Sequence, residues 1–273
     1  MHYYASFNAL LPVFAVIALG FLFKRFVHDH RDHWRAMERI SYLCLIPVLI
    51  IRVLDDADLS TLKFFDISFA LGTSLTLIFL MTMALYPLLT RPNFIFKVAC
   101  SKASYTSIFQ TSTRWHAFIA IAVASEIYDI FALQIIALAM VVMIPLINVV
   151  NVAMMYICLR KGKLKFGVLL KNIALNPMMI GIFVGIFLAF SQIELWQPIR
   201  QTIDIIADTT LGIALICIGV GLRLNISNLL TPYVICALLL KLIIFPAVTL
   251  MVAISMDIKA IELICLAIIT SVP

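Results

Sequence analysis

Long runs of apolar residues, each near the length of a membrane-spanning helix, alternate along the chain with short polar segments. The runs lack the strict alternation of apolar and polar residues that marks the strands of a membrane β-barrel. The pattern predicts an all-α polytopic membrane protein with eight complete spans and one partial span. The predicted spans cover residues 8–24, 37–54, 65–89, 103–125, 130–159, 174–191, 200–222, 233–254 and 259–273. A short outer turn containing Glu126 and Asp129 is expected between the fourth and fifth spans.

The composition agrees with a helical membrane protein and reduces the number of functions that the chain could have. Hydrophobic residues make up 64% of the chain and charged residues 12%, whereas a soluble domain is about half apolar. The six cysteines are scattered and form no C-x-x-C pair, so we expect packing residues rather than disulfides or metal ligands. The sequence contains neither H-E-x-x-H nor G-x-S-x-G and no ATP-binding P-loop. An enzyme is therefore not predicted, and neither is a cofactor or a metal site.

The net charge of +6 is distributed as a topology signal rather than as a nucleic-acid-binding patch. Fourteen basic residues lie in the connections after the first, third, fifth and seventh spans, and four lie in the alternate connections. Basic connections stay on the cytoplasmic side of a membrane. We therefore expect a multi-pass protein of the cell inner membrane, with the lipid bilayer as its partner and the N-terminus outside, on the periplasmic side. The first span precedes Lys24 and Arg25 and follows no basic segment, so it is not expected to be a removable signal.

Two stretches that begin with proline suggest an internal repeat. Pro12 and Gly20 are eight residues apart in the first predicted span, and Pro177 and Gly185 are eight apart in the sixth. Because five spans separate the starts of the two stretches, the second copy would be inverted in the membrane, as in many secondary transporters. The predicted domains are a first inverted repeat, a basic cytoplasmic linker and a second inverted repeat that is incomplete. They cover residues 1–160, 161–171 and 172–273.

The segment 109–118, FQTSTRWHAF, gathers polar side chains within the fourth predicted span. Backbone groups freed by a broken helix must face protein or water rather than lipid, so a break here would line a cavity. Arg114 offers a planar cation that suits a carboxylate, and a half-helix starting near Ala117 would point its positive dipole end toward the same anion. Alternatively, the segment is the cytoplasmic approach to a shorter span that begins at Trp115. The predicted substrate-binding residues here are Gln110, Thr111, Ser112, Thr113, Arg114 and His116.

Two further pairs of polar residues fall inside predicted spans. Asn148 and Asn151 share one helix face and would line the substrate site or, alternatively, hydrogen-bond between helices. Asp204 and Asp208 form an i, i+4 acid pair that would carry a proton or a cation. Alternatively, they lie at the wet outer end of a long helix, where Arg200 would pair with Asp204, while Asp208 would lie deeper in the span.

Several other features are expected to be structural. Lys241, near the start of the eighth predicted span, would extend its amine to the membrane surface; alternatively, it faces inward as an ion mimic or a salt-bridge partner. The segment 28–33, HDHRDH, carries metal-binding residue types, but a solvated cytoplasmic turn is the favoured interpretation. The G-x-x-x-G pattern at 181–185 and the nearby pair Gly219 and Gly221 are typical of closely packed membrane helices.

In their order and spacing, these stretches resemble the auxin efflux carrier family, in particular its bacterial branch of malonate and malate permeases. The likeness extends over nearly the whole chain, although each stretch is by itself an ordinary apolar helix pattern. It is carried by LLPVFAVIALGFLFKR (10–25), ISYLCLIPVLIIRVL (40–54), FQTSTRWHAFIAIAVASEIY (109–128), IPLINVVNV (144–152), NPMMIGIFVG (176–185), LGIALICIGVGLRL (211–224) and KLIIFPAVTL (241–250).

The resemblance implies ten helices in two inverted five-helix repeats, with broken fourth and ninth helices that cross at the substrate site. It also implies a scaffold, a mobile transport bundle and a homodimer. This sequence departs from the family at His116, where members often have Asn, and by lacking the end of the ninth helix and all of the tenth.

The sequence thus predicts a secondary transporter that moves small organic acid anions by an elevator-type alternating-access mechanism. One alternative is a truncated, non-transporting remnant of such a carrier. Another is a sodium-coupled carrier that resembles the bile-acid symporters, which would need converging carbonyl and carboxylate oxygens for the ion.

Overall fold

The computed structural model describes residues 2–26, 31–56, 64–92, 100–159, 167, 171, 174–191, 193–222 and 231–272. Every element in these ranges is a helix. Four of the described helices are long and apolar enough to cross a membrane, and three shorter ones are also apolar. The four are Phe65–Thr90, Gln134–Leu159, Gln197–Gly221 and Pro232–Ser255. The predicted helical membrane class is therefore confirmed at this level, while the number of crossings and the inverted repeat stay predictions.

The helices group into two compact units, and each takes segments from both halves of the chain. Unit 1 comprises Met1–Leu62, Phe118–Met140 and Leu175–Leu224, and unit 2 comprises Lys63–Ala117, Val141–Ala174 and Asn225–Pro273. The predicted linker, 161–171, lies almost entirely outside the described residues.

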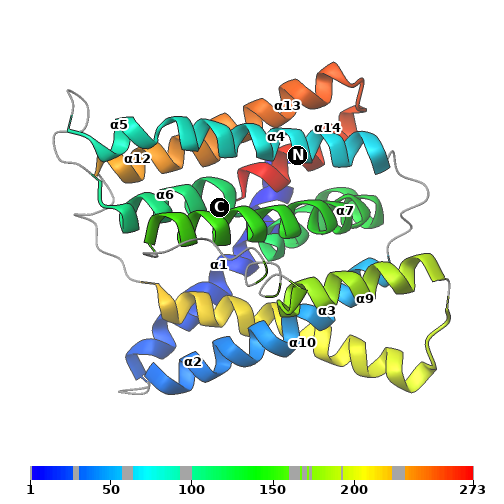
Figure 1. Cartoon of the computed structure of the whole chain (residues 1–273). Coiled ribbons are helices and arrows are strands. Elements are labelled where there is room, and N and C mark those ends of the chain that lie inside the picture. Colours follow the sequence, from blue (N-terminus) through cyan, green and yellow to red (C-terminus); the bar gives the residue numbers. More distant parts are fainter. Residues whose placement is uncertain are drawn as a thin grey trace. The chain divides into compact units, whose positions relative to one another are not determined.

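In unit 1, helix α1 packs against α10, and α3 packs against both α9 and α10 (Figure 1). Helix α9 starts where its sequence predicts, because the Asn176 side chain accepts a hydrogen bond from the Met178 amide at 3.0 Å and Pro177 occupies the first turn. The elements are α1 (His2–Phe26), α2 (Arg31–Ile40), the π-turn η1 (Ser41–Leu45), α3 (Ile46–Asp55), α9 (Pro177–Ser191) and α10 (Gln197–Gly221).

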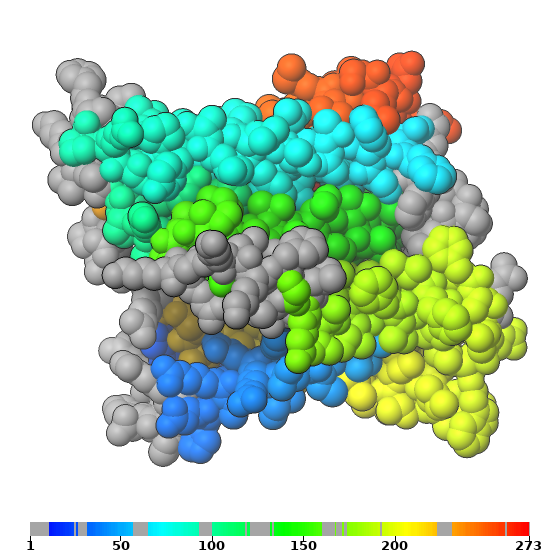
Figure 2. Space-filling view, viewed as in Figure 1, coloured from blue at the N-terminus to red at the C-terminus, as the bar shows by residue number. Residues whose placement is uncertain are grey.

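Large apolar side chains remain exposed on α9, the helix coloured yellow-green in Figure 2. Phe183, Phe187 and Phe190 lie along one side of the helix and are 59%, 63% and 66% exposed. A surface of this kind is costly in water and favourable against lipid tails, which agrees with a membrane-embedded helix.

Glycines allow the helices of unit 1 to approach at backbone distance. A Cβ atom at Gly20 would lie 2.3 Å from the carbonyl oxygen of Ile216, and one at Gly181 would lie 2.8 Å from that of Pro47. One at Gly185 would lie 2.9 Å from the Leu54 side chain. The prediction of close helix packing is confirmed at Gly181 and Gly185, and also at Gly219, where a Cβ atom would lie 2.0 Å from the carbonyl oxygen of Ile17. It is wrong at Gly221, where a Cβ atom would meet no atom of the described residues within 4 Å.

In unit 2, α4 packs against α13 and α6, α6 against α12, and α13 against α14 (Figure 1). Part of α7 also belongs to this unit. The elements are α4 (Phe64–Ala84), α5 (Tyr86–Thr90), α6 (Lys102–Thr113), α7 (Ala117–Leu159), α12 (Pro232–Leu239), the π-turn η2 (Leu240–Ile244), α13 (Phe245–Ser255) and α14 (Ala260–Ser271).

The fourth predicted span is broken, as expected. Helix α6 ends at Thr113, where Arg114 adopts an extended conformation, and α7 begins at Ala117 after three non-helical residues. The turn predicted around Glu126 and Asp129 is wrong, because α7 continues through it and merges the rest of the fourth span with the fifth. No glycine or proline occurs between 117 and 144, so nothing in the sequence stops the helix there.

Two π-turns interrupt otherwise continuous helices, and a proline follows each of them. In η1 the amide of Ile46, the residue before Pro47, donates to the backbone carbonyl of Ser41. In η2 the amide of Phe245, the residue before Pro246, donates to the backbone carbonyl of Leu240. A proline in a helix cannot donate to the carbonyl four residues earlier, and widening by one residue relieves the resulting clash. The π-turns therefore have a local cause in the sequence.

Candidate functional site

The broken helix borders a pocket of about 430 Å³ that lies entirely within unit 2. One wall is α6 together with the first residue of the break, and the other is formed by α12 and η2. The lining residues are Ser107, Gln110, Thr111, Arg114, Leu238, Lys241 and Leu242.

The α6 wall follows from helical spacing. Ser107, Gln110, Thr111 and Arg114 are separated by three or four residues, so they occupy one face of the helix and its end. The structure thus brings three of the predicted substrate-binding residues, Gln110, Thr111 and Arg114, into one pocket.

Ser112 and Thr113, which were also predicted to bind substrate, are fully buried and are not among the residues that line this pocket. Their hydroxyls donate to the backbone carbonyls of Ile108 and Phe109, each at 2.9 Å. Thr113 Oγ1 also accepts a hydrogen bond from Nδ2 of Asn151 at 3.3 Å. Because Asn151 is only 1% exposed, the alternative interpretation of this asparagine, a hydrogen bond between helices, describes its observed contact.

The remaining predicted residues of this group, His116 and Asn148, do not line the pocket either. His116 is half-buried in the non-helical segment between α6 and α7. Nδ2 of Asn148 is buried and has no hydrogen-bond partner among the described residues. Asn148 and Asn151 lie three residues apart in α7 and so share a helix face, as expected. Only Asn151 makes a contact with another helix that the structure describes.

Lys241 is the residue that sequence reasoning misplaced. Its side chain is 1% exposed, so the expected extension to the membrane surface is wrong. Its Nζ atom is buried without a hydrogen-bond partner among the described residues and lies 4.8 Å from the centre of the Phe245 ring. The signal that would have located it is Pro246, which accompanies the π-turn on which Lys241 lies, since π-turns are frequent at functional sites.

A second pocket of about 380 Å³ adjoins the first and shares Ser107, Thr111 and Leu238 with it. It is lined mainly by hydroxyl-bearing and apolar side chains. Its remaining lining residues are Ser104, Ile108, Thr231, Tyr233, Val234 and Ala237. The start of α12 and the first half of α6 thus border a hydroxyl-rich surface that leads toward the two cations.

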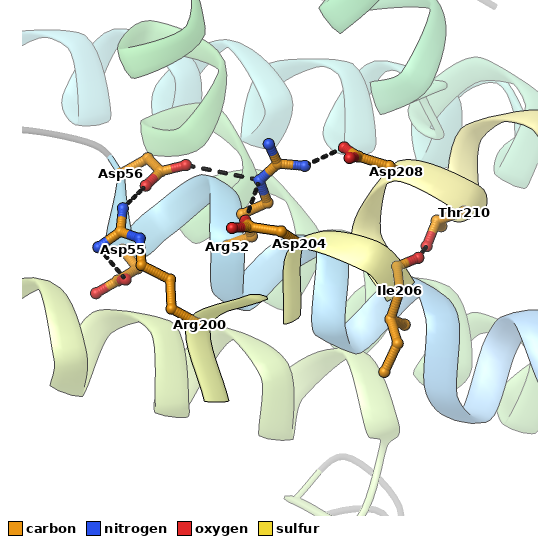
Figure 3. Close-up of polar contacts among 8 residues, drawn as sticks. All are labelled: Arg52, Asp55, Asp56, Arg200, Asp204, Ile206, Asp208 and Thr210. Carbon is orange, nitrogen blue, oxygen red and sulfur yellow. Dashed lines mark hydrogen bonds and ion pairs between the residues drawn. The ribbon is translucent and has the colours of Figure 1, made fainter. Parts of the chain in front are cut away.

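Asp204 and Asp208, predicted as candidates for proton or cation coupling, both form ion pairs with Arg52 of α3 (Figure 3). Nε of Arg52 lies 3.0 Å from Asp204, and its Nη1 contacts Asp208. The side chain of Asp208 is 69% exposed and that of Asp204 is 39% exposed, so Asp208 is not the more deeply placed of the two. The observed arrangement is an exposed ion-pair cluster, which contributes little to stability.

Arg200 does not make the expected pair with Asp204. It reaches across to the end of α3, where its Nη2 lies 2.7 Å from Asp56 and its Nη1 lies 3.9 Å from Asp55 (Figure 3). Burial raises the pKa of the Asp56 carboxyl, and the charges of Arg200 and Arg52 oppose that shift. Because Arg52, Asp55 and Asp56 lie on or at the end of α3 and Arg200, Asp204 and Asp208 lie on α10, these ion pairs join α3 to α10 within unit 1.

The six cysteines are free thiols; Cys100, Cys217 and Cys265 are buried as packing residues, whereas Cys44 is exposed. Burial raises the pKa of the Cys100 thiol, which keeps it protonated at neutral pH. Within the described ranges, no group of three or more His, Cys, Asp or Glu side chains is arranged to hold a metal ion. Residues 28–30 of the histidine-rich segment lie outside those ranges, so the prediction for that segment is untested.

Comparison of the chain with models of known protein families finds no matching family, and comparison with curated proteins finds no match.

Proposed function

We propose that this protein is a secondary carrier for small organic acid anions. The observation that carries the proposal is the pocket at the helix break, which places two cationic side chains, Arg114 and Lys241, beside the amide of Gln110 and the hydroxyls of Ser107 and Thr111. A carboxylate needs this combination of positive charge and hydrogen-bond donors. The volume of about 430 Å³ suits a small molecule.

The charge of the pocket also argues against a sodium site there. Both ionisable side chains among its described lining residues, Arg114 and Lys241, are basic, and none of these residues offers a carboxylate oxygen to Na⁺. The exposed cluster around Arg52 is already internally paired and belongs to unit 1. The anion carrier is therefore favoured over the sodium-coupled alternative for this pocket.

The proposed mechanism is of the elevator type, in which one bundle carries the site and another stays fixed in the membrane. Its support is that the pocket is built by unit 2 alone, whereas unit 1 consists of closely packed helices joined through glycines. Unit 2 would be the moving bundle and unit 1 the scaffold.

The proposed inverted repeat has support from the packing of unit 1. The first predicted span (α1) packs against the seventh (α10), and the sixth (α9) packs against the second (α3). The first helix of each repeat therefore packs against the second helix of the other repeat. The two glycines that the repeat equates, Gly20 and Gly185, lie at these two contacts. A two-fold relation between the halves produces such an exchange.

Uptake of radiolabelled malonate and malate into proteoliposomes tests the proposal. Wild-type protein should accumulate label above protein-free liposomes, because the pocket would bind the anion on one side and release it on the other. Thr111→Trp should abolish uptake, since Thr111 lines both adjoining pockets and the indole ring would fill them. Ala103→Trp is the matched control, because Ala103 is exposed on the same helix but does not line either pocket.

Two results would contradict the proposal. One is wild-type protein that transports neither acid under any imposed pH or ion gradient. The other is uptake that survives Thr111→Trp as well as it survives Ala103→Trp.

A further inference from the structure

The two cations of the pocket differ in their access to solvent. Arg114 is exposed at the end of α6, whereas Lys241 is 1% exposed. Water hydrates an exposed guanidinium and dissolved salt screens it, so its attraction for a bound anion is weak. A buried ammonium without a hydrogen-bond partner has lost its hydration and gains most from an anion that reaches it.

The surroundings of Lys241 contain no competing carboxylate among the described residues. The elements packed against η2 are α6, α12, α13 and α14. The carboxylate on α14, Glu262, accepts a hydrogen bond from the Lys259 amide at 2.9 Å and so caps its own helix. No ion pair between Lys241 and an acidic residue occurs within the described ranges. The ring of Phe245 is its one described electrostatic contact.

The π-turn keeps Lys241 in this position. Leu238, Lys241 and Leu242 line the pocket from consecutive turns of the helix, and Lys241 is the second residue of η2. Because Pro246 removes a regular helical hydrogen bond just after η2, the wider turn has a fixed cause in the chain. The ammonium is therefore held at the pocket rather than free to extend to the surface.

We infer that Lys241, rather than Arg114, is the residue that binds the anionic group of the ligand, with Arg114 acting in its capture from solution. The inference rests on the proposed function, because it assigns the charged anchor of the same pocket. It follows that the site accepts acids and rejects neutral isosteres of equal size, since a neutral ligand would leave the buried ammonium unpaired.

Binding to the 273-residue chain purified in detergent tests this assignment. The probes are malonate, malate and acetate, each compared with its amide, and the readouts are calorimetric Kd and the ligand-dependent shift in Tm. Lys241→Met should weaken malonate binding about 30-fold or more, since breaking a buried charge pair costs at least about 2 kcal/mol. The same variant should unfold at an equal or higher temperature than wild type when no ligand is present, because it removes a buried amine that has no hydrogen-bond partner among the described residues.

Arg114→Gln should weaken malonate binding by less than about five-fold, and high salt should remove the difference. Lys102→Met is the control for loss of a positive charge on α6 outside the pocket, and it should bind malonate like wild type. Lys241→Gln gives the same comparison with a polar side chain if the methionine variant does not fold.

The outcomes separate the two claims. Wild-type protein that binds none of the three acids overturns the proposed function and the assignment with it. Binding that survives in the Lys241 variants, or that Arg114→Gln abolishes at high salt, overturns the assignment alone. Binding of the amides as tight as that of the acids also overturns the assignment, because it removes the role of charge.

Discussion

Replacing Gly219 with alanine tests the packing of α1 on α10. A Cβ atom at Gly219 would lie 2.0 Å from the carbonyl oxygen of Ile17 and 2.8 Å from the amide nitrogen of Phe21. Real Cβ atoms essentially never approach closer than 3.0 Å, so the two helices must separate locally by about 1 Å. Both colliding atoms belong to the backbone of α1, and rotating a side chain cannot relieve the contact.

The expected loss is at the upper end of the range for overpacking, about 3 kcal/mol in the free energy of unfolding. For a chain of this size, each 1 kcal/mol lowers Tm by about 2–4 °C, so Gly219→Ala should lower Tm by about 6–12 °C. Thermal unfolding in detergent, followed by circular dichroism and by the exposure of buried cysteines, measures the shift.

Gly212→Ala is the matched control on the same helix. A Cβ atom at Gly212 would meet no atom of the described residues within 4 Å, and alanine is favoured over glycine inside a helix by about 0.5–1 kcal/mol. This variant should therefore be as stable as wild type or more stable. If Gly219→Ala unfolds at the wild-type temperature, or if both variants lose stability equally, the described contact between α1 and α10 is wrong.

Two further predictions concern polar contacts inside each unit. In unit 2, a double-mutant cycle of Asn151→Ala and Thr113→Val, measured by unfolding, should give a coupling energy of about 0.5–1.5 kcal/mol, the usual net value of one hydrogen bond; a coupling of zero would mean that the bond is not made. In unit 1, Arg52→Gln should cost about 1 kcal/mol at low ionic strength and less in about 1 M salt, because the ion pairs of Arg52 are partly exposed. A loss in Tm that does not change with salt would instead indicate that Arg52 acts by packing.

The sequence by itself determined the features that depend on near neighbours. Apolar runs of membrane-spanning length indicated the helices, and the polar segment 109–118 indicated the break between α6 and α7. Helical spacing also places Gln110, Thr111 and Arg114 together. A local prediction that failed was the turn at Glu126 and Asp129, where two acidic residues without a helix-breaking glycine or proline do not end a helix.

Only the tertiary structure decided which polar groups meet. The sequence around Asp204 does not show whether this residue pairs with Arg200, four residues away, or with Arg52 on another helix. It pairs with Arg52 because α3 packs against α10. In the same way, the position of Lys241 in the sequence is compatible with either a surface or a pocket location. Its side chain lies at the pocket because it belongs to the π-turn η2 and α6 forms the opposite wall. Contacts between residues that are more than a hundred positions apart depend on which helices pack together, and local propensity and periodicity carry no information about that choice.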